Sequence, residues 1–131
     1  MDTNAHEPAI RVSMLPRDTN GHGTIFGGVL LAYIDQAGAI ATRPYCNLVV
    51  TIKMNEVVFH QPVYVGDVVS FYAKVTRIGT TSITVKVTVT AERWRESGNV
   101  VKVTEAEVVY VNVGEDRRPT PIRKTAPVET A

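Results

Sequence analysis

Asp35 is a carboxylate in the middle of a segment whose apolar residues recur at helical spacing. It shares a stripe with Leu31 and Gly38, and alanines and glycines surround it in the sequence. Small neighbours leave space beside the carboxylate, and a carboxylate partly withdrawn from water can act as a general base toward water or as a nucleophile. The alternative interpretation is a solvated aspartate on a helix surface, which is the usual position of this residue type.

A glycine pair opens the same helical segment. Gly27 and Gly28 have no side chains, so their backbone N–H groups are approachable, and the N-terminus of a helix carries partial positive charge. Two such donors could form an oxyanion hole. Close packing explains Gly27 equally well. In the loop before the helix, Asn20 precedes a glycine and is typical of a turn, and His22 between two glycines could carry protons.

The elements that must position these residues follow from the hydrophobic pattern. Residues 10–15 predict a short strand and residues 27–42 a helix, which Pro44 ends. A change of face in the last strand predicts a β-bulge near Thr104-Glu105. Segments that are β-branched or alternate between apolar and polar residues predict four more strands in a meander, at residues 48–59, 67–78, 81–92 and 100–113.

The helix is rich in small residues, and a single helix can cover only one face of a five-strand antiparallel sheet. We therefore expect an α+β fold in which the sheet wraps around one long central helix, the hotdog arrangement. The open edge of so small a sheet predicts that two copies pair as a homodimer. This fold accounts for residues 1–113 as a single domain and leaves residues 114–131 as an exposed tail.

Composition excludes several classes of function. The 131 residues suffice for one domain, and the apolar fraction of 44% is that of a globular protein. A net charge of +1 gives no reason to expect a nucleic acid or an anionic membrane as a partner. No run approaches the ~20 apolar residues of a membrane-spanning helix, and Met1–Pro8 has no signal core. We expect a soluble, cytoplasmic protein.

Cysteine and histidine usage points to chemistry without disulfides or metals. Cys46 is the only cysteine, so no intrachain disulfide can form, and its place after a proline at the end of the helix favours a structural role. The three histidines do not have the spacing of metal ligands. His60, near Pro62 at the end of a strand, is interpreted as structural. No phosphate-binding glycine motif implicates ATP or NAD.

Four blocks of the sequence carry a resemblance. They are residues 18–28, which contain Asp18-Thr19-Asn20, and residues 33–40, 59–67 and 77–82. In this order they resemble the acyl-CoA thioesterases of the hotdog family, in particular the bacterial YciA type and the brain acyl-CoA hydrolases. The resemblance extends from about residue 11 to 113. It implies hydrolysis of fatty acyl-CoA to a free fatty acid and CoA, in homodimers that assemble further as trimers of dimers.

The resemblance also implies roles for individual residues. Asp35 matches the catalytic carboxylate, and Asn20 matches a catalytic asparagine that comes from the partner chain and holds the water or the thioester oxygen. Gly28 is favoured for the oxyanion hole. Coenzyme A is part of the substrate, so no cofactor is implied. Whether Asp35 acts as a base or through a mixed anhydride stays open.

Further residues are candidates for binding the substrate. Phe26, Gly27 and Phe59 are expected near the acyl chain, although core filling explains Phe26 equally well. The family loop that contacts CoA matches Gly79, Thr80, Thr81 and Ser82, which also fit an ordinary hairpin turn. Candidate partners for the CoA phosphates are Arg77, Arg93, Arg95, Arg117 and Arg118.

Two other functions fit the same fold. A hotdog dehydratase or hydratase acting on acyl-CoA or acyl carrier protein pairs a catalytic histidine with a helix carboxylate, whereas the loop here offers Asn20. A non-catalytic acyl-CoA-binding module is the second, but such regulators usually carry a DNA-binding domain, and 131 residues leave no room for one.

Overall fold

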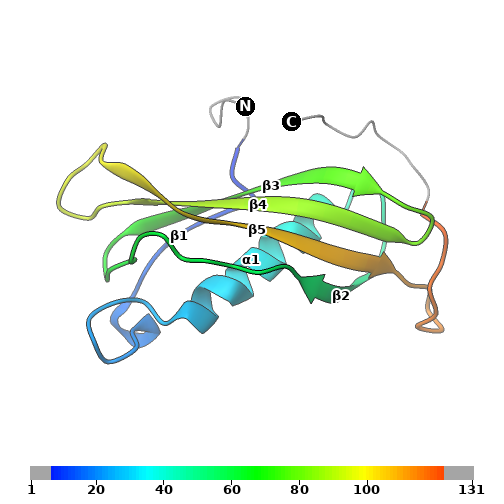
Figure 1. Cartoon of the computed structure of the whole chain (residues 1–131), viewed down its shortest axis with the longest axis horizontal. Coiled ribbons are helices and arrows are strands. Elements are labelled where there is room, and N and C mark those ends of the chain that lie inside the picture. The colour runs from blue at the N-terminus through cyan, green and yellow to red at the C-terminus, as the bar shows by residue number, and fades with distance from the viewer. Residues whose placement is uncertain (1–6, 123–131) are drawn as a thin grey trace.

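The computed structural model describes residues 7–122, which form one antiparallel sheet and one long helix. The sheet curls around the helix, and both lie along the longest direction of the molecule (Figure 1). This arrangement confirms the expected hotdog fold. The elements are β1 (Ile10–Ser13), a short 3-10 turn η2 (Pro16–Asp18), α1 (Gly27–Ala41), β2 (Val49–Met54), β3 (Val68–Ile78), β4 (Ser82–Glu92) and β5 (Val100–Asn112).

The strand order is β1-β3-β4-β5-β2. The predicted meander of four strands is therefore wrong for its first strand, β2, which pairs with β5 and not with β3. Hairpin turns join β3, β4 and β5 as neighbours, and β1 occupies the free edge of β3 through pairs such as Ile10 with Phe71. The outer edge of β5 remains open, and β2 pairs there, with Thr51 opposite Tyr110. Residues 55–67 are long enough to return the chain from one edge of the sheet to the other.

A bulge in β5 reconciles its two halves, as predicted. Val89 of β4 lies opposite Thr104, whereas Thr90 lies opposite Lys102, so Val103 is the additional residue. Both Val103 and Thr104 are fully buried. The Thr104 hydroxyl donates a hydrogen bond to the carbonyl of Val58, at 2.6 Å, which satisfies the buried polar group and holds the segment after β2 against β5.

The predicted strand 48–59 is shorter in the structure and ends at Met54. Residues 55–60 still follow β5, because the N–H of Asn55 donates to the carbonyl of Glu107 and the N–H of His60 donates to that of Val103. A second register shift lies inside β2 between Thr51 and Lys53. The ladder resumes after this shift with Lys53 and Met54, so β2 covers six of the twelve predicted residues.

The buried stripe of α1 packs on the concave face of the sheet. Leu30, Ile34, Ala37 and Gly38 are buried, in agreement with the predicted helical periodicity. At Gly38 the helix backbone meets Tyr110 of β5, where an added Cβ would overlap the phenol oxygen. The Tyr110 hydroxyl donates a 2.7 Å hydrogen bond to the main-chain carbonyl of Asp35. The small residues of the helix thus let β5 approach its backbone directly.

Residues 114–122 are mostly exposed but remain attached to the end of the sheet. The Asn112 side chain donates to the carbonyls of Thr120 and Pro121, and the N–H of Ile122 donates to that of Thr80. Residues 123–131 of the predicted tail lie outside the described residues, so the domain boundary at residue 113 stays a prediction. Among residues 7–122, α1 is too short to cross a membrane and no other helix is longer.

Gly38→Ala tests the contact between α1 and β5. We expect the added methyl group to displace the Tyr110 ring and to lower the free energy of unfolding by about 1–3 kcal/mol, although alanine is the better helix former. Urea denaturation followed by circular dichroism measures the change. Gly27→Ala is the matched control, because its Cβ would lie 3.5 Å from Phe59 in ordinary contact. Equal stability of wild type and Gly38→Ala would contradict the close approach.

Candidate active site

Asp35 lies half-buried near the middle of α1 and is held by two neighbouring strands. The Thr51 hydroxyl of β2 donates a 2.7 Å hydrogen bond to Oδ1 of its carboxylate. The Tyr110 hydroxyl of β5 holds its main-chain carbonyl. Because a carboxylate can accept about four hydrogen bonds, the Asp35 carboxylate keeps acceptor sites for a water molecule. Its backbone and its side chain are both fixed, as a positioned base requires.

The first turn of α1 gathers four of the residues predicted to bind or stabilise the substrate. An added Cβ at Gly28 would meet the ring of Phe26, and one at Gly27 would lie 3.5 Å from the ring of Phe59. No hydrogen bond within the described residues uses the N–H of Gly27 or Gly28, as expected for the first turn of a helix. Two free donors between two partly exposed aromatic rings fit the predicted oxyanion and acyl-binding roles.

Asn20 belongs to a tight loop directly before this turn. Its Nδ2 donates to Oγ1 of Thr24 at 2.7 Å, and its Oδ1 accepts from the N–H of His22 at 2.8 Å. Gly21 and Gly23 adopt φ of +91°, which glycine allows and other residues rarely adopt. The side chain of Asn20 is exposed but organised, and it makes no hydrogen bond to Asp35 of the same chain.

One chain does not bring the predicted catalytic groups together. Gly28 and Asp35 are seven residues apart in α1, which places them on the same helix face but about 10 Å apart along the axis. A single thioester carbonyl must lie within about 3 Å of both the oxyanion donor and the attacking water. Within one protomer these groups are therefore too far apart to serve the same carbonyl.

The predicted CoA loop lies at the opposite end of the sheet from Asn20. Gly79, Thr80 and Thr81 form the hairpin tip between β3 and β4 and lead into Ser82, whose carbonyl accepts from the N–H of Gly79 at 2.8 Å. The loop around Asn20 lies at the start of β3 instead, where Thr24 bridges to Tyr64 (Figure 1). The eleven residues of β3 separate the two loops by about 35 Å.

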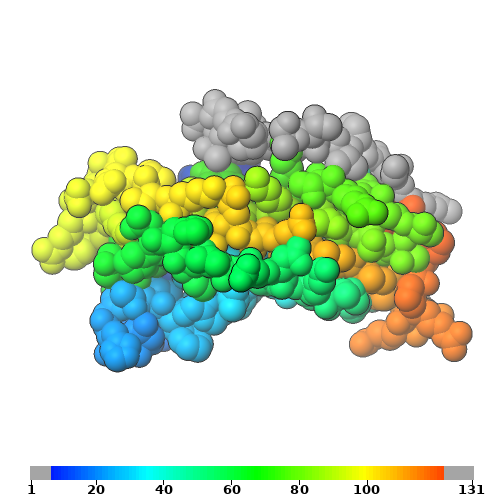
Figure 2. Space-filling view, viewed as in Figure 1, coloured from blue at the N-terminus to red at the C-terminus, as the bar shows by residue number. Residues whose placement is uncertain are grey.

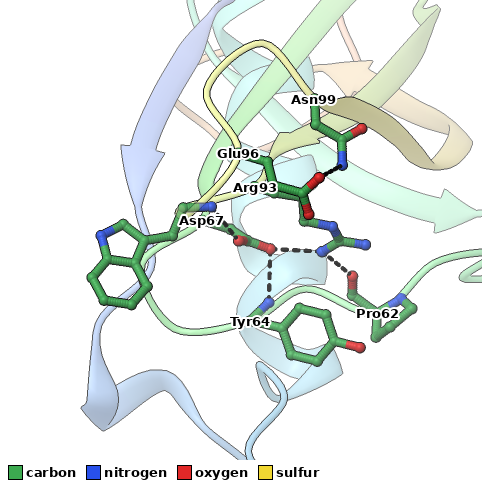
Figure 3. Close-up of polar contacts among 7 residues, drawn as sticks. Pro62, Tyr64, Asp67, Arg93, Glu96 and Asn99 are labelled. Carbon is green, nitrogen blue, oxygen red and sulfur yellow. Dashed lines mark hydrogen bonds and ion pairs between the residues drawn. The ribbon is translucent and has the colours of Figure 1, made fainter.

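Arg93, a predicted partner of the CoA phosphates, is already paired (Figure 3). Its guanidinium lies 2.7 Å from Oδ2 of Asp67, which is 2% exposed, and it also donates to the carbonyl of Pro62. The Asp67 carboxylate accepts the N–H groups of Tyr64 and Trp94 as well. This network joins the segment before β3 to the hairpin after β4. Arg93 therefore has a structural role, and its proposed contact with phosphate is dropped.

Neither histidine among the described residues contacts Asp35. His22 lies in the exposed loop and His60 beside the β5 bulge. Cys46 is buried, and burial raises the pKa of its thiol, which disfavours the reactive thiolate. Within residues 7–122 no three histidine, cysteine, aspartate or glutamate side chains gather as a metal site.

Comparison with known proteins assigns the chain to a family. A family model described as the thioesterase superfamily matches residues 22–97, more than half of the chain. The chain belongs to the thioesterase superfamily. The match includes the helix that carries Asp35 and the hairpin 79–82, and it confirms the resemblance found in the sequence.

Three relatives of this thioesterase are similar over most of their length. The acyl-CoA thioester hydrolase YciA of Salmonella typhimurium is 38% identical over 124 residues, which are 92% of this chain and 93% of the relative. A hexameric hotdog fold thioesterase of Campylobacter jejuni is 46% identical, with a TM-score of 0.85 over 91% of this chain and 92% of its own. A hexameric broad-specificity acyl-coenzyme A thioesterase is 32% identical, with a TM-score of 0.84 over 89% of this chain and 81% of its own.

Thr51 and Tyr110 contact Asp35 in the candidate site, and sequence reasoning missed both. Thr51 is one of several β-branched residues in its strand, and nothing in its spacing distinguishes it. Tyr110 reads as one apolar position of an alternating strand. Their significance comes from the pairing of β2 with β5, which places them opposite each other and both against Asp35.

Tyr110→Phe tests how Asp35 and Tyr110 interact in the thioesterase. Burial, and secondly the negative charge of Asp35, raise the pKa of the Tyr110 phenol above its ordinary value of 10.0. The unfolded chain loses this proton near pH 10 while the folded chain keeps it. The stabilisation is therefore complete below pH 10 and is lost as the pH rises further.

Above pH 10 we expect Tyr110 to lower the free energy of unfolding by about 1.4 kcal/mol per pH unit. Tyr110→Phe removes this slope, while at neutral pH it lowers stability by about 1 kcal/mol through the lost hydrogen bond. Urea titrations from pH 7 to pH 11 measure both effects. The difference between the two proteins isolates the contribution of Tyr110. Identical alkaline slopes in the two proteins would contradict the buried, protonated phenol.

Proposed function

We propose that this thioesterase hydrolyses fatty acyl-CoA to a free fatty acid and CoA, with Asp35 as the residue that activates water. The observation that carries the proposal is the half-buried Asp35 carboxylate, which the Thr51 hydroxyl orients at 2.7 Å. The names of the relatives support the substrate class, since they include an acyl-CoA thioester hydrolase and a broad-specificity acyl-coenzyme A thioesterase.

The proposed reaction needs only water and side chains of the protein. Asp35 takes a proton from a bound water, and the water oxygen attacks the thioester carbonyl carbon. The backbone N–H of Gly28, assisted by Gly27, donates to the oxyanion that forms. The carbon–sulfur bond then breaks, the fatty acid leaves, and the CoA thiolate receives the proton that Asp35 took. Asn20 holds the water or the thioester oxygen.

Two chains build each proposed site. Gly28 and Asp35 lie ~10 Å apart along one helix. If a second α1 runs antiparallel to the first, Gly28 of one chain lies beside Asp35 of the other, and the two groups can serve one carbonyl. Asn20 precedes the same helix turn and arrives from the partner with it. The dimer expected from the sequence thus becomes a requirement of catalysis.

The open edge of the sheet supports this dimer. In the isolated chain β2 pairs on one side only, with β5, and Figure 2 shows its segment lying uncovered across one face of the molecule beside α1. Leu48, Val50 and Ile52 are exposed there, Ile52 by 57%, as is Ile40 of α1. An unpaired strand with exposed apolar side chains favours pairing with a second copy. The relatives described as hexameric support three such dimers per assembly.

Mixing two inactive variants tests the shared site. We expect Asp35→Asn and Asn20→Ala each to lose thiol release from acyl-CoA. In an equal mixture that exchanges subunits, half of the dimers are hybrids, and each hybrid retains one intact site. About a quarter of wild-type activity should therefore return. A thiol-reactive dye follows turnover, and two affinity tags verify that hybrids form.

The control mixes Asp35→Asn with a chain carrying both substitutions, which leaves no intact site. Hybrids without activity in the test mixture would refute the shared site. Near wild-type hydrolysis by a folded, dimeric Asp35→Asn would refute the proposed role of Asp35.

A single turnover in ¹⁸O-water distinguishes the base from the nucleophile. If Asp35 activates water, the first fatty acid released carries the label, because the water oxygen bonds to the acyl carbon. An anhydride opened at the Asp35 carbon instead leaves the label on the protein and releases unlabelled acid. Mass spectrometry of the product with enzyme in excess measures this. Unlabelled fatty acid would contradict the general-base mechanism.

A further inference from the structure

The Asn20 amide is held at both ends within its own loop. Its Oδ1 accepts from the N–H of His22 at 2.8 Å, and its Nδ2 donates to Oγ1 of Thr24 at 2.7 Å. A backbone N–H can only donate, so the contact with His22 fixes which end of the amide is the oxygen. The contact with Thr24 fixes the nitrogen. The amide therefore has one orientation before any ligand binds.

One N–H of this amide remains free for a ligand. An asparagine amide has two N–H donors and an oxygen with two acceptor sites. Thr24 takes one donor and His22 takes one acceptor site, and the Asn20 side chain makes no other hydrogen bond among residues 7–122. The side chain is exposed. The second N–H therefore points into solvent from a nitrogen whose place is set by Thr24.

Thr24 fixes the main chain of Asn20 as well. The N–H of Asn20 donates to the carbonyl of Thr24 at 2.9 Å, so one residue holds both the backbone and the side chain. Between the two, Gly21 and Gly23 have φ of +91°, which lets the loop fold back on itself. Threonine is β-branched and its χ1 angle is restricted, so its hydroxyl stays where the backbone places it.

Thr24 is in turn attached to the folded sheet. It forms an antiparallel bridge with Tyr64, whose N–H donates to the buried Asp67 carboxylate at 2.9 Å (Figure 3). The guanidinium of Arg93 pairs with the same carboxylate and lies 4.9 Å from the centre of the Tyr64 ring. The exposed amide of Asn20 is thus connected through Thr24 to a buried ion pair.

A second threonine of this loop makes a different contact. The Thr19 hydroxyl donates to the carbonyl of Pro16 at 2.9 Å, within the turn that precedes the loop. It makes no hydrogen bond with the Asn20 amide. Of the two loop hydroxyls, only that of Thr24 touches the proposed catalytic group.

We propose that Thr24 is a positioning residue of the thioesterase, whose hydroxyl orients the Asn20 amide toward the site completed by the partner chain. This inference rests on the proposed function, in which Asn20 holds the attacking water or the thioester oxygen. A donor that is already oriented needs no reorganisation when the substrate arrives, and its misplacement slows the reaction. Thr24 acts through Asn20 and not on the substrate.

Substitutions of Thr24 test the role of the hydroxyl. Valine keeps the branched shape and removes the acceptor, whereas serine keeps the acceptor. With the acyl-CoA that the wild type cleaves fastest, we expect kcat of Thr24→Val to fall about tenfold and KM to stay within about twofold of wild type. Thr24→Ser should keep kcat within about twofold. Thr24→Ala replaces the valine variant if that protein does not assemble.

Thr19→Val is the matched control, because it removes the other hydroxyl of the loop and should keep kcat within about twofold of wild type. Circular dichroism and size-exclusion chromatography verify the fold and assembly of each variant. Equal losses in Thr19→Val and Thr24→Val would overturn the inference, because the effect would then come from the loop as a whole. A tenfold loss in Thr24→Ser would overturn it too, since the acceptor is still present.

Mixed dimers show on which chain Thr24 acts. Asp35→Asn and Thr24→Val are combined in equal amounts, as in the exchange experiment above. Each hybrid has one site with an intact Asp35 and, from the other chain, an unchanged Thr24, so about a quarter of wild-type activity should return. If Thr24 acted on Asp35 of its own chain, only about a twentieth would be measured, and the inference would fail.

Failure of the inference differs from failure of the proposed function. Loss of hydrolysis in Asn20→Ala without loss in Thr24→Val refutes the inference alone. Wild-type hydrolysis by Asn20→Ala refutes the proposed role of Asn20 and the inference with it. Losses in both variants, with activity restored in Thr24→Ser, are the result that we expect.

Discussion

The contact between Tyr110 and the backbone of α1 is the interaction on which the rest of the structure depends. The Tyr110 hydroxyl reaches the carbonyl of Asp35 because Gly38 has no side chain in its path. This close approach lets β5 run along the helix, and β5 carries the edge strand β2. Thr51 then lies opposite Tyr110 and reaches the Asp35 carboxylate. The contacts that pack the helix against the sheet are therefore the same contacts that orient the proposed catalytic group.

The fold leaves the proposed site incomplete in one chain. A helix fixes the distance between Gly28 and Asp35, and no side-chain movement can shorten it, because both belong to one rigid element. In the proposed dimer, a second copy of the chain pairs at the open edge of β2 and supplies the missing groups. In the same proposed dimer, the surface that pairs the sheets also brings the two helices side by side, so activity would depend on assembly.

The two ends of the sheet have different chemistry. At one end, Asp67 neutralises Arg93, and the loop with Asn20 presents amide and backbone donors near the start of the helix. At the other end, four arginines lack ion-pair partners among residues 7–122, namely Arg43, Arg77, Arg117 and Arg118.

The sequence by itself determined the helix, the alternating strands, the bulge in β5 and the hotdog class, because these depend on local periodicity and on small residues that are visible along the chain. It also singled out Asp35 and the glycine pair by residue type and spacing. Only the tertiary structure decided that β2 pairs with β5, that Thr51 and Tyr110 hold Asp35, and that Arg93 is bound to Asp67. These facts follow from which distant segments meet, and side chains of ordinary type gain their roles only when the sheet edge and the helix face bring them together.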